Sequence, residues 1–130
     1  ADIIAGFPTE TEAHFENSVR LVEECGLAFL HVFPYSPRPG TPAARMPQLD
    51  KAVVKERAAR LRETGEIALK THFSRHIGEM REALVERGTA ARLPDFTPVK
   101  LSCDPGQAGR VVRAHITGHD GRQLIGDVTE

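Results

Sequence analysis

The sequence predicts an α/β segment followed by a small all-β barrel, within a chain of 130 residues. Two short apolar runs near the N-terminus flank an amphipathic stretch, which is the pattern of a strand–helix–strand (βαβ) unit with parallel strands. A long charged stretch then predicts a helix. The last part of the chain alternates apolar and polar residues between turn signals, as in a small antiparallel β-barrel. We therefore predict two domains, residues 1–73 and 74–130.

Apolar residues and a helix-capping signal predict the N-terminal strands and helix. Residues 2–7, DIIAGF, form the first predicted strand and residues 27–33, LAFLHVF, the second. Between them, Thr9 is expected to cap a helix, with the Glu12 side chain reaching back to the Thr9 amide in a capping box. Cys25 lies in the apolar pattern of this helix, so we expect it to be a small core residue.

A stiff loop and a long helix follow. Residues 37–47 contain several prolines, each of which fixes its own φ, and they predict a rigid loop. Asp50 can cap a helix that runs to about Phe73, with Gly65 as a tolerated interruption. Residues 45–75 hold eight basic and four acidic side chains. That excess fits either a solvated helix face or a surface that meets phosphate.

Strand patterns fill the rest of the chain. We expect strands in residues 76–86, 93–101 and 109–117, then a hairpin turn at 119–121 and a return strand at 123–126. The alternation within 109–117 predicts that Val111 and Arg113 face one side of the strand, and that three side chains face the other: Val112, Ala114 and Ile116.

Composition excludes several classes of protein. The net charge of −1 argues against a general polyanion-binding protein, and no apolar run is long enough to span a membrane. The two cysteines lack metal-ligand spacing and nothing calls for a disulfide, so a reducing cytoplasm is expected. His72 and His76 are four residues apart, but no third ligand lies near them in the sequence, so no metal site is predicted.

Three features together resemble the methylthiotransferase branch of the radical S-adenosylmethionine enzymes. The first is residues 2–11, DIIAGFPTET, similar to that family's D-I-I-x-G-F-P-G-E-T, with Thr9 where the family usually has glycine. The second is residues 35–44, YSPRPGTPAA, and the third is Arg57 in the long helix. The tail resembles a degenerate TRAM domain, and residues 31–36, HVFPYS, are most similar to the branch that modifies threonylcarbamoyladenosine in tRNA.

The resemblance implies an enzyme larger than this chain. It would place a methylthio group at the adenine C2 of threonylcarbamoyladenosine beside the anticodon, using S-adenosylmethionine and two 4Fe-4S clusters. Missing N-terminal domains of the same polypeptide would hold the clusters. This chain would be the end of a radical S-adenosylmethionine (β/α) barrel plus the TRAM-like tail, without catalytic residues, without bound cofactor and inactive alone. Expected partners are tRNA and those missing domains. The open strand edges also predict association between copies of this chain, either by pairing of these edges or by exchange of elements between copies.

The resemblance also assigns site residues. At the end of the first strand, which in the family lies near the adenosyl part of the cofactor, three residues are expected to bind it: Gly6, Phe7 and Pro8. Tyr35, Ser36 and Arg38 offer a phenol, a hydroxyl and a planar cation and are also expected to bind it. The Arg38 guanidinium could hold the methionine carboxylate of the cofactor or the threonyl carboxylate of the substrate, and both remain open. By analogy, four basic residues of the tail are expected to contact RNA: Arg81, Lys100, Arg113 and Arg122.

Two other functions are weighed against this one. The chain could be a non-catalytic RNA- or protein-binding module. It could also belong to a methylthiotransferase that acts on isopentenyladenosine or on a ribosomal-protein aspartate. A C-x-x-x-C-x-x-C motif upstream of Ala1 would favour the enzyme over the binding module.

Overall fold

The computed structural model describes residues 1–106 and 108–129. The chain divides into two compact units, Ala1–Leu69 and Lys70–Glu130, and the long helix α2 (Lys51–His76) contributes to both. Within the described residues, no helix has the length and apolar character needed to cross a membrane.

The first unit begins with the expected strand–helix–strand arrangement. Strand β1 (Asp2–Ala5), helix α1 (Glu12–Glu24) and strand β2 (His31–Pro34) follow one another, and β2 pairs with β1 in parallel along its whole length. A short 3₁₀ helix, η1 (Ala43–Arg45), lies in the proline-rich loop before α2 begins. The prediction of parallel strands joined by a helix is confirmed, because a helical crossover is what returns the chain in the same direction.

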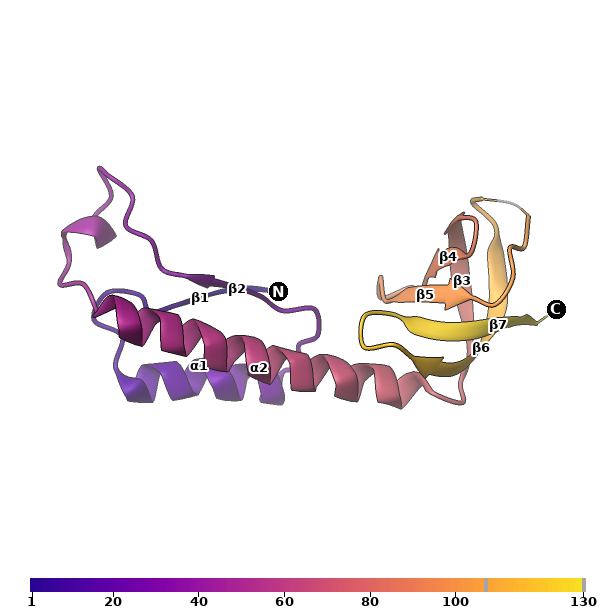
Figure 1. Ribbon diagram of the computed structural model, residues 1–130, viewed down its shortest axis with the longest axis horizontal. Helices are drawn as coiled ribbons and strands as arrows, with labels where there is room; N and C mark the ends of the chain where they lie inside the picture. Colours follow the sequence, from indigo (N-terminus) through magenta and orange to yellow (C-terminus); the bar gives the residue numbers. More distant parts are fainter. Residues whose placement is uncertain (107, 130) are drawn as a thin grey trace. The chain divides into compact units, whose positions relative to one another are not determined.

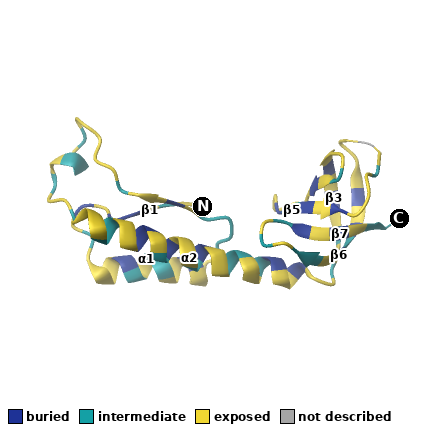
Figure 2. Cartoon of the chain, viewed as in Figure 1, coloured by how far each residue is buried: buried dark blue, intermediate teal, exposed yellow. Residues whose placement is uncertain are grey.

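The core of this unit lies between the two strands and the two helices. α1 and the first part of α2 cover one face of β1 and β2 (Figure 1), and Figure 2 shows buried residues where these elements face each other. The buried cluster draws on all four elements: Ala5, Phe15, Val22, Val32, Ala58 and Leu61. On the opposite face, Ile4 and Phe33 are register partners and are 54% and 52% exposed. Association of copies through these strands stays a prediction.

The start of α1 differs from the prediction. The helix is capped by Thr11, whose hydroxyl accepts from the His14 amide, and the His14 ring in turn accepts from the Thr11 amide. Thr9 was the wrong capping residue, because its φ of 72° is left-handed whereas a capping residue is extended. The same φ explains why glycine suits this position: a branched side chain at positive φ is strained.

We therefore predict that Thr9→Gly stabilises the first unit by about 1 kcal/mol, since it removes the strain of a left-handed, branched residue. Urea unfolding followed by tyrosine fluorescence measures this, because Tyr35 is the single tyrosine and the chain has no tryptophan. The matched control, Thr11→Ala, is expected to lose about 1 kcal/mol with the cap. A loss of stability in Thr9→Gly would contradict the assignment of strain.

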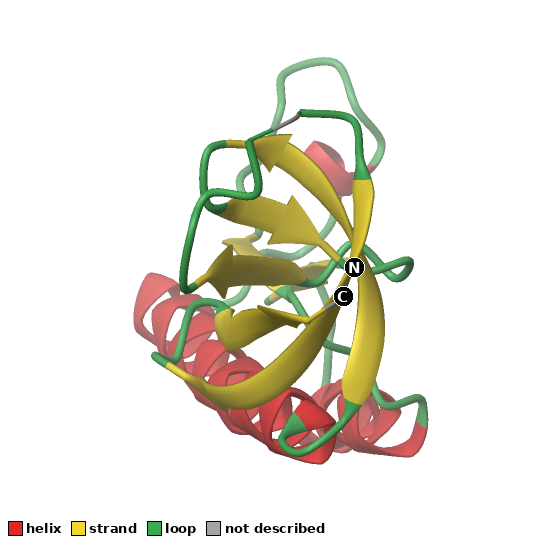
Figure 3. Cartoon of the chain, turned by 90° about the vertical axis from the view of Figure 1, so that its right-hand side faces the viewer, coloured by secondary structure: helices red, strands yellow, loops and turns green. Residues whose placement is uncertain are grey.

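The strands of the second unit form a closed five-stranded barrel, which faces the viewer in Figure 3. Its strands are β3 (Met80–Arg87), β4 (Ala90–Arg92), β5 (Pro98–Leu101), β6 (Val111–His119) and β7 (Leu124–Thr129). They close in the order β3-β4-β5-β7-β6. The predicted small barrel is thus present, and its hairpin turn between β6 and β7 is confirmed.

The sequence had predicted a purely antiparallel barrel, and this is wrong in one pairing. Four of its pairings are antiparallel, but β5 and β7 run in parallel. A ring with an odd number of strands requires this, because directions cannot alternate all the way around it. The predicted alternation in β6 is confirmed by the buried side chains: Val112, Ala114 and Ile116.

The end of α2 and the environment of Cys25 differ from the prediction. α2 extends to His76 rather than stopping near Phe73, and the next strand starts only at Met80. Between them the chain turns at Gly78, which has a φ of 89°. Cys25 follows the last residue of α1 as its C-terminal capping residue and is exposed, so it is not the core residue expected.

Candidate functional site

The candidate site lies where β1 and β2 end. Since Ala5 and Pro34 are register partners, Gly6 and Tyr35 follow at the same edge of the sheet. The Tyr35 amide donates to the Ala5 carbonyl at 2.8 Å, and the Tyr35 ring meets the Phe7 ring edge-on with centroids 5.6 Å apart. The structure therefore brings together two of the predicted motifs that are separated by a helix in the sequence.

A cavity of about 480 Å³ opens beside this edge. The loop from Pro34 to Pro37 forms one wall and the N-terminal half of α2 forms the other. The α2 wall carries three cations, Lys51, Lys55 and Arg62, and no carboxylate is among the described lining residues. The surroundings therefore favour an anionic ligand.

The Tyr35 hydroxyl points to the same kind of ligand. It is buried and has no hydrogen-bond partner within the described chain. A buried hydroxyl without a partner costs about 1–3 kcal/mol, a cost that a ligand oxygen accepting its proton would remove. A carboxylate supplies such oxygens and also suits the neighbouring cations.

A second cavity of about 450 Å³ adjoins the other side of the same loop. Tyr35 and Ser36 line both cavities, whereas Arg38 lines only this one. The loop is held in place at Arg38, whose carbonyl accepts from the Thr41 hydroxyl at 2.8 Å and from the Thr41 amide at 3.2 Å. The exposed Arg38 guanidinium is thus carried on a backbone that is itself fixed.

Gly6 and Pro8 line neither of the two cavities and instead pack next to the site. The Gly6 amide donates to the Glu10 carboxylate at 3.2 Å, so this N–H group is already hydrogen-bonded within the chain. Pro8 is fully buried and has no N–H to donate. Gly6 packs tightly against Val54, a residue that lines the first cavity.

The cations of α2 were missed as individual site residues. The excess of basic residues in 45–75 was the available signal, but it fits a solvated helix face equally well. Only the approach of α2 to the strand ends separates the two interpretations, since it places Lys51, Lys55 and Arg62 around one cavity.

The four basic residues predicted to contact RNA occupy separate positions on the barrel. Lys100 of β5 and Arg113 of β6 are exposed, and register places Arg113 opposite Glu82. Arg122 lies in the exposed turn between β6 and β7. Arg81 is partly buried and lies 3.5 Å from the Glu79 carboxylate, so an internal ion pair already engages it.

Sequence reasoning also missed Phe96 on this unit. Its side chain is 76% exposed, and its φ of 68° is left-handed. Phe96, Leu84 and Val111 line a shallow cavity of about 360 Å³. An exposed aromatic ring of this kind can stack on an unpaired base. Residues 93–101 had been predicted to be a strand, but the strand β5 begins only at Pro98, so Phe96 lies in the loop before it.

Similarity to known proteins decides the family. The threonylcarbamoyladenosine tRNA methylthiotransferase MtaB of Rickettsia prowazekii is 51% identical to this chain over 119 residues, covering 91% of the chain. The tRNA-2-methylthio-N(6)-dimethylallyladenosine synthases of Sorangium cellulosum and Mycobacteroides abscessus are 41% and 40% identical, over 99% and 98% of the chain. The chain belongs to the methylthiotransferase family. This confirms the resemblance predicted from the motifs.

The match to the methylthiotransferases concerns part of those proteins. The chain spans 28%, 26% and 25% of the lengths of these three relatives and corresponds to the C-terminal part of a methylthiotransferase. No family profile matches the chain.

The 4Fe-4S clusters that the resemblance implies for the complete enzyme do not fit the residues of this segment. A 4Fe-4S cluster is held by cysteine thiolates, commonly four. The chain has two cysteines, Cys25 and Cys103, which are free, exposed and located in different units. S-adenosylmethionine is a different case, because its carboxylate matches the cationic cavity and the buried Tyr35 hydroxyl.

Proposed function

We propose that this chain is the C-terminal part of a tRNA methylthiotransferase that modifies the adenine C2 of threonylcarbamoyladenosine. The observation that carries the proposal is the 51% identity to an enzyme named for that nucleoside. Relatives named for dimethylallyladenosine are 35–41% identical to the chain. In this proposal S-adenosylmethionine and the clusters act in the complete cytoplasmic polypeptide, and the present segment alone is inactive.

We further propose that the first unit supplies a carboxylate-binding wall of the active site. Tyr35 would donate its hydroxyl proton to the carboxylate, while the cations of α2 would balance its charge. The methionine carboxylate of S-adenosylmethionine and the threonyl carboxylate of the substrate share this chemistry. Ser36 and Arg38 line the second cavity. They would contact the molecule, cofactor or substrate, whose carboxylate is bound there.

For the second unit we propose contact with tRNA. The support is the exposure of Lys100, Arg113 and Arg122 on the barrel, together with the exposed ring of Phe96. Arg81 contributes less in this proposal, since it is paired with Glu79. Contacts to phosphates from the three exposed cations would weaken with rising salt.

Nucleoside analysis tests the proposed function. We expect the longer polypeptide that contains this chain, expressed in bacteria lacking their own enzyme, to yield methylthiolated threonylcarbamoyladenosine in digested tRNA, as measured by mass spectrometry. The present segment expressed alone is expected to give none. In the longer polypeptide, Tyr35→Phe and Arg38→Ala should lower product formation at limiting S-adenosylmethionine or limiting tRNA, which separates the two carboxylates.

The control for these variants is Arg20→Ala, an exposed residue of α1 away from both cavities. Methylthiolated isopentenyladenosine in place of the expected product would refute the substrate assignment but keep the family. Tyr35→Phe and Arg38→Ala turning over like the unmodified enzyme at limiting concentrations of both reactants would refute the carboxylate wall.

A further inference from the structure

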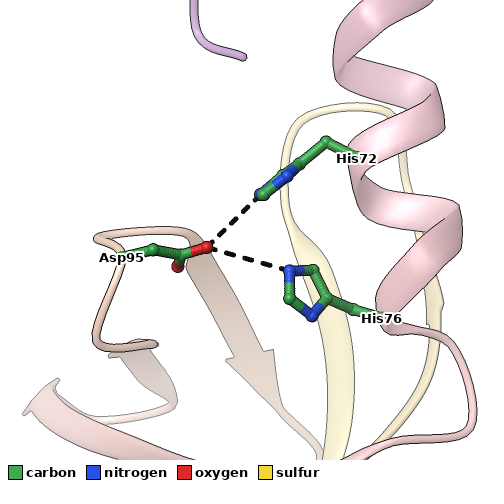
Figure 4. A group of neighbouring side chains, drawn as sticks. All are labelled: His72, His76 and Asp95. Atoms are coloured by element: carbon green, nitrogen blue, oxygen red, sulfur yellow. Dashed lines mark ion pairs between the residues drawn. The ribbon is translucent and has the colours of Figure 1, made fainter. Parts of the chain in front are cut away.

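Three side chains in the second unit converge on one another without belonging to the site described above. His72 and His76 lie on the last turns of α2, and Asp95 lies in the loop between β4 and β5 (Figure 4). One ligand-type atom from each residue lies within 4.8 Å of the other two. The two histidines share a face of α2 because they are four residues apart. Asp95 reaches them only through the fold of the barrel.

The distances favour a shared ion over direct hydrogen bonds. Asp95 Oδ2 lies 3.6 Å from His72 Nε2 and 3.8 Å from His76 Nε2. Both separations are too long for N–H···O hydrogen bonds. Ligand atoms held about 2.0–2.2 Å from one tetrahedral Zn²⁺ lie roughly 3.3 Å apart. The two Asp95 contacts are within about half an ångström of that spacing, and the three ligand atoms, which lie within 4.8 Å of one another, would draw closer around an ion.

The neighbouring contacts orient His76 as a ligand. The His76 Nδ1 atom lies 2.9 Å from the Glu79 carboxylate, which favours the tautomer with the proton on Nδ1. That tautomer leaves Nε2, on the side of Asp95, with a lone pair. Metal-binding histidines commonly make this type of outer contact to a carboxylate.

His72 is prepared in a different way. Burial, followed by the charge of His76, lowers the pKa of His72, which favours the neutral ring that a metal requires. Its Nε2 lies 2.9 Å from the Thr97 hydroxyl, the contact that an ion would replace. Thr97 would keep its hydrogen bonds to Asp95, and its amide already donates to the Asp95 carboxylate at 3.1 Å.

The side chains around the cluster carry as many negative as positive charges, so no net positive charge opposes a divalent cation. Burial acts to raise the pKa of Asp95, but hydrogen bonds from Thr97 together with the charges of His72 and His76 lower it overall, which favours the ionised carboxylate. Glu79 adds a second negative charge next to His76, while Arg75 and Arg81 are the cations that face the histidines. A bound divalent ion would therefore meet two carboxylates and two cations.

We propose that His72, His76 and Asp95 form a binding site for a divalent transition-metal ion, with Zn²⁺ as the best-fitting ion and water as the fourth ligand. Two imidazoles and a carboxylate are a donor set that Zn²⁺ accepts in tetrahedral geometry. The ion cross-links the C-terminal turn of α2 to the β4–β5 loop within the second unit. It is thus a structural clamp, separate from the iron–sulfur chemistry of the family.

The test is a zinc titration of the untagged chain carrying Cys25→Ser and Cys103→Ser, because exposed thiolates would otherwise bind zinc. We expect one Zn²⁺ per chain, measured by elemental analysis after dialysis and by competition with a chromophoric chelator. His72→Ala and Asp95→Asn should each weaken binding by more than tenfold. Glu79→Gln, which changes only the outer contact, should weaken it by about tenfold.

Matched controls and a second readout keep the test decisive. His31→Ala and Asp104→Asn change exposed residues of the same types and should leave zinc affinity unchanged. Asp95→Asn keeps an oxygen for the Thr97 amide, so its circular dichroism should match that of the parent chain. In ¹⁵N spectra of the six histidines, Zn²⁺ should shift the Nε2 signals of His72 and His76. Equal zinc affinity in the parent, His72→Ala and Asp95→Asn, or unshifted signals of both rings, would overturn the proposal.

Discussion

Replacing Arg57 by alanine is expected to destabilise the first unit by about 3–5 kcal/mol, because it leaves a buried carboxylate without its partner. Arg57 Nη1 lies 2.9 Å from the Glu10 carboxylate, and the two side chains are only 9% and 10% exposed. The same nitrogen donates to the Glu10 carbonyl at 2.9 Å. Arg57 thus fixes α2 to the segment that joins β1 to α1.

Tyrosine fluorescence during urea unfolding measures this loss, since Tyr35 reports on the first unit alone. The control is Arg60→Ala. Arg60 pairs with Glu12 and Glu16, but its side chain is 39% exposed, so solvent screens the interaction and the loss should be much smaller. Equal losses for Arg57→Ala and Arg60→Ala would show that burial of the pair does not matter.

A double variant separates the pair from the rest of the packing. Arg57→Met with Glu10→Gln removes both charges and keeps side chains of similar size. It should be more stable than Arg57→Ala, because no uncompensated charge remains buried. Part of the loss should persist, since methionine cannot donate to the Glu10 backbone carbonyl as Arg57 does.

The alternating patterns in the sequence predicted most of the secondary structure. Residues two apart in β6 share a face whatever the surrounding fold, so the common face of Val112, Ala114 and Ile116 follows from the sequence, and the structure shows that this face is buried. The parallel pairing of β1 and β2 follows equally from the helix between them. Strand β4 was missed because Ala90–Arg92 is too short to show a pattern.

Predictions failed where backbone geometry or distant residues decide the outcome. Thr9 and Thr11 both suit a helix cap chemically, and only the left-handed φ at Thr9 separates them. The helix α2 continues through Gly65, as predicted, but the packing of Leu30 against this glycine was not predicted. Neither φ values nor such close contacts can be inferred from residue types alone.

In the candidate site, too, some residues are indicated by the local sequence and others only by the folded structure. Tyr35 and Ser36 could be predicted because they directly follow a strand, and strand ends collect ligands. The cations of α2 and the approach of Asp95 to His72 depend on contacts between segments far apart in the sequence. Those contacts become visible only when the chain is folded.

Gly6 links the fold to the candidate site, and Gly6→Ala is expected to cost about 2–4 kcal/mol in the first unit. Two effects contribute. The φ of 82° is unfavourable for any residue with a side chain. A Cβ atom at Gly6 would also lie 2.7 Å from Val54 Cγ1 and 2.8 Å from Cγ2, which is closer than packed atoms allow.

The two effects can be separated experimentally, because Val54→Ala removes the atoms that clash. Gly6→Ala with Val54→Ala should recover the steric part relative to Val54→Ala alone and retain the backbone strain of about 1–2 kcal/mol. Gly26→Ala is a suitable control: its φ is 60°, but a Cβ there would meet no atom within 4 Å, so only strain should appear. Because Val54 lines the cationic cavity, Gly6→Ala should also lower product formation by the longer polypeptide even under conditions where it remains folded. Stability and product formation both unchanged in Gly6→Ala would mean that the strand end and α2 separate easily, and that the cavity between them is not a fixed feature of the fold.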